Sequence, residues 1–389
     1  MPWKVSDEVN ERMKFVLRAE EGEAMTALCR EFGISRTTGY KYLERYRQEG
    51  PKGLYDRSSA PRRRPHKTAP DVEQAIVDLR EKYGWGPRKL RKVLSRKEPG
   101  VKLPALSTIA AILKRRGLIE PRRKRPAVPP DKSALFTPTR ANELWCADFK
   151  GQFRTRDGRY CYPLTITDSF SRSLLCCEAL ESTRGEPVMC VFERIFREFG
   201  LPETIRTDNG SPFASRALHG LSRLSVFWRR QGIRHQRIDP GHPEQNGQHE
   251  RMHRTLKAEA TRPPGDNLLQ QQEQFDHFRA RFNEVRPHEA LGDDTPASWY
   301  RPSLRRFRKV GDLEYPLDDF SRRVLCDGRV HLPKAFPGRH SRLTVSRPLE
   351  GEVVGFRELD DGRWLVRWGD LQLGFVDFER WRIEPLSET

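Results

Sequence analysis

The stretch Leu201-Pro202-Glu203-Thr204-Ile205-Arg206-Thr207-Asp208-Asn209-Gly210 decides how the centre of this 389-residue chain is interpreted. Its brief apolar run predicts a buried strand that ends at Asp208, and Asn209-Gly210 signals a turn directly after it. A carboxylate at the end of a strand is well placed to hold a hard metal ion. Asp-Asn-Gly is also a common turn without chemistry, so the rest of the chain must decide between these two interpretations.

The composition predicts several domains and a polyanionic partner. A chain of this length exceeds one ordinary core, so two to four domains are expected. Lys and Arg number 72 against 54 Asp and Glu, and the resulting net charge of +18 favours nucleic acid as the partner. An anionic membrane surface is the alternative, but the sequence offers no basic amphipathic helix, lipid signal or long apolar run. We therefore expect no membrane contact.

The seven cysteines are interpreted as reduced and mostly buried. They form no Cys-x-x-Cys pair and no His/Cys cluster at zinc spacing, and the start of the chain has no apolar signal core. Such cysteines are typical of intracellular proteins. Together with the basic charge, they predict a cytoplasmic protein with a nucleic-acid partner.

Residues 1–56 are predicted to form a helix-turn-helix DNA-binding domain. A short amphipathic segment is followed by a break at Gly33 and by Ser35, which stands where an N-cap is expected. The helix that follows is basic and polar near its start, as in a recognition helix, although a plain helical hairpin would look similar. Its predicted DNA contacts are Ser35, Arg36, Thr37, Thr38 and Lys41.

Residues 70–120 are predicted to form a second helix-turn-helix-like domain. Helices are expected over 71–83 and 87–96, with a third helix capped by Ser107. Arg88 and Lys89 of the strongly basic middle helix are further predicted DNA contacts.

Basic, proline-rich linkers are expected at residues 57–69 and 121–140. The first carries a run of three cations and the second a run of four. The first could follow a phosphate backbone or enter a minor groove, with a merely solvated linker as the alternative. The predicted DNA contacts here are Arg62, Arg63, Arg64, Arg122, Arg123 and Lys124.

Residues 141–305 show the order of elements of a ribonuclease-H-like mixed sheet with flanking helices. Strand patterns over 144–150, 160–168 and 172–180 predict a meander of three strands. After the meander come a helix over 186–199, the strand into Asp208, a helix over about 215–231, a strand over about 233–238 and a helix from near Gln248. Residues 315–389 predict a small β-barrel, because short alternating strands are separated by turns such as Asp360-Asp361-Gly362. The fold class is thus multidomain α/β.

Three carboxylates of the central domain form a candidate metal site. Asp148 lies in the middle of a strand, where a charge is costly unless it is solvated or bound. The first and fourth strands of a ribonuclease-H-like sheet are neighbours, so Asp148 and Asp208 can converge, and the following helix can add Glu250. Oxygen ligands of this kind suit Mg²⁺ or Mn²⁺. Two such ions, about 3.5–4 Å apart, support phosphodiester displacement.

The motifs around these acids resemble the core of the retroviral-integrase superfamily, and most closely bacterial insertion-sequence transposases with an Asp-Asp-Glu active site. The motifs are Trp145-x-x-Asp148, Thr207-Asp208-Asn209-Gly210 and His242-Pro243-x-x-Asn246-Gly247-x-x-Glu250-Arg251. The front of the chain resembles the helix-turn-helix region of the same group. The segments there are Gly33-Ile34-Ser35, Glu49-Gly50-Pro51-x-Gly53-Leu54-Tyr55-Asp56-Arg57 and Trp85-Gly86-Pro87-Arg88-Lys89-Leu90.

The resemblance implies a DNA transposase that binds the ends of an insertion element and catalyses 3′-end cleavage and strand transfer. Asp148 would bridge two Mg²⁺ ions, for which Mn²⁺ could substitute, and Asp208 and Glu250 would each complete one site. Water would free a 3′-OH that then attacks target DNA, with no covalent protein–DNA intermediate. The implied partners are double-stranded DNA, as element ends and as target, and further copies of this chain in a dimer or larger assembly.

The identity of the third carboxylate is open between two glutamates. Many relatives place 35 residues between the second Asp and the Glu, which here selects Glu244, whereas 41 residues separate Asp208 from Glu250. We choose Glu250, because it occupies the motif position on the predicted helix and Glu244 precedes the Asn-Gly turn. The extra six residues are attributed to the helix over 216–231.

Other polar residues near these acids have less certain roles. Arg254 and Lys257 would share a helix face with Glu250, either as phosphate contacts or as solvated side chains. Asp168, beside Arg172, is interpreted as a structural ion pair.

Two other functions fit part of the same pattern. A metal-dependent, structure-selective nuclease would keep the fold without recombination, but it gains little from base-reading helices. A non-catalytic DNA-binding regulator would keep the domains, but all three acids are present.

Overall fold

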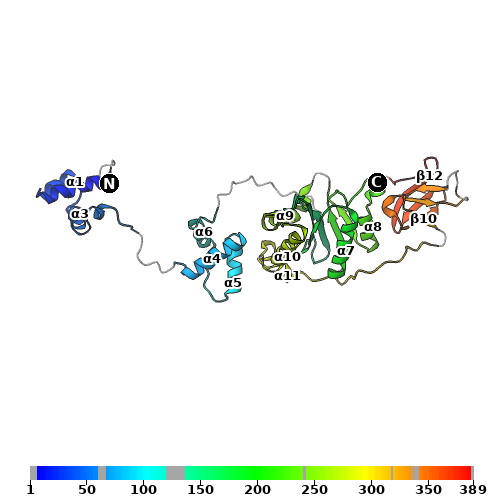
Figure 1. Ribbon diagram of the computed structural model, residues 1–389, viewed down its shortest axis with the longest axis horizontal. Helices are drawn as coiled ribbons and strands as arrows, with labels where there is room; N and C mark the ends of the chain where they lie inside the picture. The colour runs from blue at the N-terminus through cyan, green and yellow to red at the C-terminus, as the bar shows by residue number, and fades with distance from the viewer. Residues whose placement is uncertain are drawn as a thin grey trace. The chain divides into compact units, whose positions relative to one another are not determined.

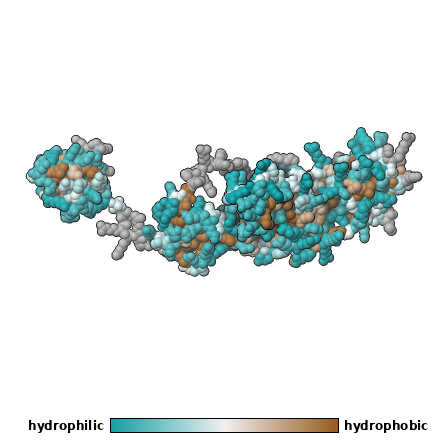
Figure 2. All heavy atoms as spheres, in the orientation of Figure 1, coloured by the Kyte–Doolittle hydropathy of each residue, from teal (hydrophilic) through white to brown (hydrophobic). Residues whose placement is uncertain are grey.

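The computed structural model describes residues 7–59, 67–119, 136–239, 242–316, 319–333, 336 and 341–386. The chain divides into two units, Met1–Ala69 and Pro70–Thr389, whose elements are labelled in Figure 1. Hydrophilic residues dominate the visible surface of each unit (Figure 2). Among the described residues, no helix combines the length and the apolar character needed to cross a bilayer.

The first unit is a small helical domain around one apolar core. It consists of α1 (Glu8–Glu20), α2 (Met25–Glu31), α3 (Arg36–Glu49) and the 3-10 turn η1 (Gly50–Leu54). Ser35 caps α3 as predicted, because its hydroxyl accepts a hydrogen bond from the Thr38 amide at 3.2 Å. Tyr42 and Leu43 face the core and Lys41 faces solvent.

Gly39 explains how closely α3 packs on its neighbours. A Cβ at this position would lie 2.8 Å from both Cys29 Sγ and Phe15 Cζ, closer than real side-chain contacts. A glycine inside a helix is intrinsically unfavourable, so close packing is the physical reason for it here.

The second helical group contains α4 (Pro70–Tyr83), α5 (Pro87–Lys97) and α6 (Leu106–Arg115). Pro87 occupies the first turn of α5, as predicted. The prediction of Ser107 as an N-cap was wrong. Ala105 is the capping residue, since its backbone is extended and its carbonyl accepts the first helical bond from the Ile109 amide at 3.0 Å. Ser107 therefore lies inside the first turn of α6.

The central sheet has the ribonuclease-H-like strand order β4-β3-β1-β5-β6, with the short β2 also paired to β3. β3 runs antiparallel to β1, β2 and β4, whereas β1, β5 and β6 are mutually parallel. The strands are β1 (Leu144–Phe149), β2 (Phe153–Arg154), β3 (Tyr160–Asp168), β4 (Leu174–Leu180), β5 (Thr204–Thr207) and β6 (Arg234–Arg237). This arrangement confirms the predicted mixed sheet.

Two apolar clusters cover opposite sides of this sheet, because side chains alternate along each strand. Helices α7 (Gly185–Phe199) and α8 (Arg223–Arg230) contribute to the cluster that contains Trp145 and Ile205. Helices α9 (Gly247–Ala260) and α10 (Leu268–Glu284) contribute to the cluster that contains Cys161 and Cys177. Figure 1 shows α7 and α8 on one side of the strands and α9 and α10 on the other.

The helix predicted over about 215–231 is shorter in the structure. Its first part forms only the 3-10 turn η2 (Leu218–Gly220), and α8 begins at Arg223. His219 and Gly220 have positive φ angles of 52° and 65°, which interrupt a right-handed helix. Ser222 then starts α8 with a reciprocal capping box to Ser225.

The C-terminal strands form a nearly closed barrel, as predicted. Their order is β7-β10-β11-β12-β13-β9-β8, and the end strands β7 and β8 contact each other. The bounds are β7 (Phe320–Arg323), β8 (Arg329–His331), β9 (Arg342–Thr344), β10 (Val353–Glu358), β11 (Trp364–Trp368), β12 (Leu371–Asp377) and β13 (Arg382–Glu384). Trp368 packs inside the barrel core.

The remaining short elements connect these parts. They are η3 (Pro243–Asn246), η4 (Glu289–Leu291), α11 (Pro296–Trp299) and η5 (Arg347–Leu349).

Candidate active site

The parallel pairing of β1 with β5 brings two of the predicted acids together. Cys146 pairs with Arg206, and the same register continued by two residues sets Asp148 beside Asp208. The Asp208 carboxylate accepts a hydrogen bond from the Gly210 amide at 3.1 Å. The turn interpretation and the site interpretation are therefore compatible, because the turn fixes the carboxylate just beyond the strand.

Contacts with β6 hold this turn in place. The Asn209 side chain donates a hydrogen bond to the Ile238 carbonyl at 2.8 Å, and the Thr207 hydroxyl lies 2.9 Å from His235 Nε2. The His235 pKa is lowered to about 4, chiefly by burial and then by the charges of Arg237 and Arg229. A neutral imidazole thus supports the strand end next to Asp208.

Glu250 contributes to the electrostatics of the same place from the first turn of α9. Burial is the largest cause that raises the Asp148 pKa to about 7, followed by the charge of Asp208, and the charge of Glu250 acts in the same direction. A divalent cation beside Asp148 would offset the unfavourable effect of the other two carboxylates on its ionisation. The oxygen ligands present fit such an ion.

The side chain of Glu244 lies outside the described residues, although its backbone belongs to η3. The choice of Glu250 over Glu244 therefore remains a prediction.

A buried hydrogen-bond cluster that sequence reasoning missed joins α9 to β3 behind Asp148. The Thr165 hydroxyl lies 2.7 Å from Nε2 of both His249 and His253, and it donates to the Asp148 carbonyl at 3.0 Å. The Thr167 hydroxyl lies 2.8 Å from His249 Nδ1. The spacing of the histidines, i and i+4 on one helix, and of the threonines, i and i+2 on one strand, was the available signal.

The two imidazoles of this cluster are neutral. Burial lowers the His253 pKa to about 3 and holds the His249 pKa well below its usual range. Ligand atoms of Asp148, His249 and His253 lie within 4.8 Å of one another, so the trio could in principle hold a metal. Because both ring nitrogens of His249 are already hydrogen-bonded, we assign the histidines to positioning α9 and cation binding to the carboxylates.

Asp168 is a structural residue, as expected, but its principal partners differ from the predicted one. It is fully buried and accepts hydrogen bonds from the Asn142 amide at 2.8 Å and from the amide and hydroxyl of Ser171 at 2.8 and 2.6 Å. Arg172 acts on it through its charge, which lowers the Asp168 pKa against the larger effect of burial.

The predicted DNA contacts have three different fates. Ser35, Arg36, Thr37 and Lys41 are exposed on α3 and Thr38 is half-buried, whereas Arg62, Arg63, Arg64, Arg122, Arg123 and Lys124 lie outside the described residues. Arg88 forms ion pairs with Glu289 and Asp293, and Lys89 lines a cavity. Arg254 and Lys257 are exposed on α9. Their roles in DNA binding remain predictions.

Comparison with known families assigns a domain type to each of these regions. Residues 138–243 and 231–296 match integrase core domains, and residues 7–55 and 38–113 match homeodomain-like domains.

Proteins of bacterial insertion elements are among the relatives. An uncharacterized 39.2 kDa protein of insertion element IS476 from Xanthomonas euvesicatoria is 28% identical over 46% of this chain and 50% of its own length. An uncharacterized 31.7 kDa protein of insertion element IS407 from Burkholderia multivorans is 26% identical over 59% of this chain and 82% of its own length. The match thus spans half the length of the first of these relatives.

Solved structures of viral integrases are similar at lower identity. The integrase catalytic core domain of HTLV-2 in complex with magnesium matches 42% of this chain and 99% of that chain, with 16% identity and a TM-score of 0.34. The chain thus contains an integrase core domain and homeodomain-like domains, and it is similar to proteins of bacterial insertion elements.

Proposed function

We propose that this chain belongs to the retroviral-integrase superfamily and is a DNA transposase that cleaves the 3′ ends of an insertion element and transfers them into target DNA. One observation supports the proposal: β1 pairs in parallel with β5, so Asp148 and Asp208 lie toward the carboxyl ends of two neighbouring central strands, and the charges of Asp208 and Glu250 both act on Asp148. Acids that converge in this way are suited to the divalent cations that phosphodiester displacement uses.

The three carboxylates share one role in this proposal. Asp148, Asp208 and Glu250 would together hold two Mg²⁺ ions, for which Mn²⁺ could substitute. Bound ions would activate the attacking oxygen and stabilise the leaving oxygen. The chain itself would keep its ligands fixed, through the turn at Asp208 and through the cluster of Thr165, His249 and His253.

The proposal assigns the homeodomain-like regions to the recognition of element ends. The exposed start of α3 supports this assignment, because basic and hydroxyl side chains there have the chemistry of base and phosphate contacts. Two element ends must be held together for transposition, so a dimer or larger assembly on DNA is expected. In a bacterium such a protein would act in the cytoplasm, at the nucleoid.

The test is a joining assay with purified protein, Mg²⁺ and labelled DNA that carries the flanking repeats. Wild-type protein should nick the 3′ ends and join them to target DNA, and Asp208→Asn should abolish both steps. Asp276→Asn, on the exposed side of α10, is the matched control and should retain them. Full strand joining by Asp208→Asn would refute the mechanism. Cleavage without joining would favour the nuclease, and tight binding without either step would favour the regulator.

The same assay decides between the two glutamates. Glu250→Gln should lose cleavage and joining, whereas Glu244→Gln should keep both. Activity that survives Glu250→Gln would exclude this residue as the third ligand.

A further inference from the structure

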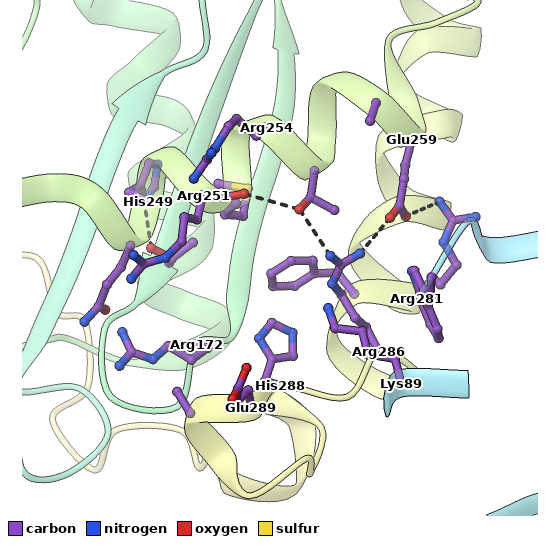
Figure 3. A pocket seen from close by; sticks show the side chains of 18 of the residues that line it. Lys89, Arg172, His249, Arg251, Arg254, Glu259, Arg281, Arg286, His288 and Glu289 are labelled. Atoms are coloured by element: carbon purple, nitrogen blue, oxygen red, sulfur yellow. Dashed lines mark hydrogen bonds and ion pairs between the residues drawn. The ribbon is translucent and has the colours of Figure 1, made fainter. Parts of the chain in front are cut away.

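A large basic cavity lies beside the catalytic acids, on another face of α9. Its volume is about 1200 Å³, and its lining comes from the α4–α5 turn, from β1, from β3 and the turn that follows it, and from α9, α10 and η4. In Figure 3, the side chains of Arg172, Arg251, His288 and Arg286 surround one common space. Neither Asp148 nor Asp208 nor Glu250 lines it.

Positive charge is in excess in this cavity. Its basic lining residues are Lys82, Lys89, Arg172, Arg251, Arg254, Arg281 and Arg286, and its acidic ones are Asp168, Glu259 and Glu289. Each acid already has partners: Asp168 binds backbone and Ser171, Glu259 binds Arg281 and Arg286, and Glu289 binds Arg88. Within the described part of the chain, no carboxylate lies within 4.0 Å of the charged groups of Arg172, Arg251 or Lys89.

Several buried polar atoms of the lining have no hydrogen-bond partner among the described residues. They are Trp85 Nε1, Arg172 Nη1, Arg281 Nε and His288 Nε2. Trp85 is only 4% exposed, so water does not readily replace the missing partner of its indole N–H. Buried groups of this kind are nearly always satisfied in native proteins. Their gathering in one cavity points to a ligand with several acceptor atoms.

Arg172 adds an independent indication from its backbone. Its φ angle is +64°, a left-handed conformation that favours glycine, asparagine or aspartate over a long side chain. Strained residues of this type concentrate at binding sites. The presence of an arginine at this position is therefore better explained by a role of its guanidinium group than by the needs of the turn.

The cations of the lining also disfavour one another. Burial, followed by the charge of Arg286, lowers the Lys89 pKa to about 8. Burial, followed by the charge of Arg251, lowers the Arg172 pKa. An anion placed between these groups would reverse both effects.

We propose that this cavity binds a backbone phosphate of a nucleic-acid strand, apart from the carboxylate site, with Arg172, Arg251 and Arg286 as its anion ligands. The guanidinium groups supply the fork-shaped donors that suit phosphate. A single phosphate would leave most of the volume empty, whereas a nucleotide unit would use it. Tyr83 is half-buried and stacks on the buried Trp85 at 4.4 Å, and both line the cavity, so the exposed part of Tyr83 is the aromatic surface available to a base.

The position of the cavity beside α9 indicates which part of the DNA it would bind, namely the strand within a few nucleotides of the carboxylates. Arg251 follows Glu250 directly, so the two side chains point about 100° apart around the helix. Arg254 lies between these directions and lines the cavity. A strand that passes the carboxylates could therefore continue into the cavity within a few nucleotides. This step rests on the proposed function, since it requires DNA as the substrate.

The experiment measures binding of a dinucleoside monophosphate to the full chain in EDTA, by calorimetry, so that neither metal nor catalysis contributes. A ligand with one phosphodiester gains little from the helix-turn-helix domains, whose non-specific affinity needs many phosphates. Arg172→Asn should weaken binding about tenfold or more, as expected for a lost charge-assisted contact. Because asparagine tolerates a positive φ, this variant should keep or raise the melting temperature.

Arg184→Asn is the matched control. Arg184 is exposed, precedes α7 and does not line the cavity, so its loss should leave dinucleoside affinity unchanged. On longer DNA, Arg172→Asn should reduce the salt dependence of binding by about one phosphate contact, and Arg184→Asn should not.

Three results would overturn the inference. They are equal dinucleoside affinity for Arg172→Asn and wild type, an equal loss in Arg184→Asn, and inorganic phosphate binding as tightly as the dinucleoside. The last would mark a free-anion site instead of a nucleic-acid site. A chain that binds the dinucleoside through Arg172 but never joins strands would refute the proposed function and leave this inference standing.

Discussion

Helix α9 has opposite chemistry on two adjacent faces. One face carries Glu250 and Lys257 and, on its inner side, His253, which lies 3.7 Å from the Asp148 carboxylate. The other face carries Arg251 and Arg254 into the basic cavity. The fourteen residues of α9 thus contribute to both proposed sites, the acidic one for cations and the basic one for anions. Side chains one position apart on a helix diverge by about 100°, so neighbours in sequence serve different ligands.

The two faces differ in how they are assembled. The acidic site uses two neighbouring parallel strands and the first turn of one helix. The basic cavity draws on residues from Lys82 to Ala290, so its lining is distant in sequence and close only after folding. A short motif can encode the first arrangement, whereas the second appears only in three dimensions.

The sharpest test of this comparison separates the two faces by single substitutions. Glu250→Gln should reduce strand joining by about a thousandfold, because a metal site that loses a carboxylate loses several kcal/mol of transition-state stabilisation. Its affinity for the dinucleoside should stay within about twofold of the wild-type value, because Arg251 lines the cavity and Glu250 does not. The measurements are the joining assay and calorimetry in EDTA.

Arg251→Gln is the reciprocal variant. This variant should bind the dinucleoside monophosphate with about tenfold lower affinity and should retain measurable strand joining. If both variants lose both properties equally, the two faces are one site and the comparison fails.

The next test concerns the hydrogen-bond cluster of Thr165, His249 and His253, which positions the whole of α9. Thr165→Val should lower the unfolding free energy by about 2–4 kcal/mol, because two buried imidazoles lose the hydroxyl at 2.7 Å. Denaturant midpoints would measure the loss. Thr165→Ser keeps the hydroxyl and should stay close to wild type. Since α9 would shift as a whole, Thr165→Val should weaken joining and dinucleoside binding together, unlike Glu250→Gln. A stable variant with one property intact would show that the cluster does not position the helix.

These contrasts show which parts of the molecule its sequence could predict. Alternation and order of elements were enough for the central sheet, the barrel and the capped α3. The helix over 215–231 was overestimated, because two positive φ angles do not register in hydrophobic periodicity. Ser107 was misassigned as a cap because the N-cap is the residue at which the backbone changes from extended to helical. That residue is Ala105, whose side chain cannot form a capping hydrogen bond and therefore gives no signal in the sequence.

The candidate site was predictable to a different degree. Asp148 and Asp208 follow from neighbouring strands, so strand order alone brings them together. Predicting the cluster at Thr165 would have required knowing how β3 is positioned against α9. Predicting the basic cavity would have required knowing that Arg88, Lys92 and Arg96 of α5 form ion pairs close to η4. Such long-range contacts leave no local pattern. Charge alone did not reveal that Arg88 pairs with Glu289 and Asp293 of this chain, and its predicted role in DNA binding stays a prediction.

The negative charge of Glu259 inside the cavity allows a test with a smaller expected effect. The Glu259 carboxylate binds Arg281 at 2.9 Å and Arg286 at 2.6 Å. Glu259→Gln removes one negative charge and keeps the shape, so dinucleoside affinity should rise about threefold to tenfold, as an effect of roughly 1 kcal/mol predicts. The ligand-free protein should melt at lower temperature, since two guanidinium groups lose their partner. Glu273→Gln, on the exposed side of α10, is the control. Weaker binding by Glu259→Gln would contradict an anion site.

The smallest effect concerns pH and Lys89. Its pKa is lowered to about 8, by burial first and then by Arg286, while Glu259, Asp293 and Glu289 oppose this shift. His288 also faces Lys89, but its pKa of about 3 keeps it neutral across the range in question. As pH rises from 7 to 9, Lys89 loses its proton and the cavity loses one positive charge. Affinity for a dinucleoside of constant charge should therefore fall about two- to fivefold.

Stability should change in the opposite direction over the alkaline range. A lysine whose folded pKa is depressed binds fewer protons in the folded than in the unfolded chain between pH 8 and its ordinary value, so the contribution of Lys89 to stability rises with pH there. Lys89→Arg keeps its charge and should abolish the pH dependence of binding, whereas Lys89→Met should bind weakly at every pH. Binding that is equally steep in pH for wild type and Lys89→Arg would assign the titration to another group. A buried cation of the cavity without a carboxylate partner predicts that affinity falls with rising pH while the stability of the folded state increases.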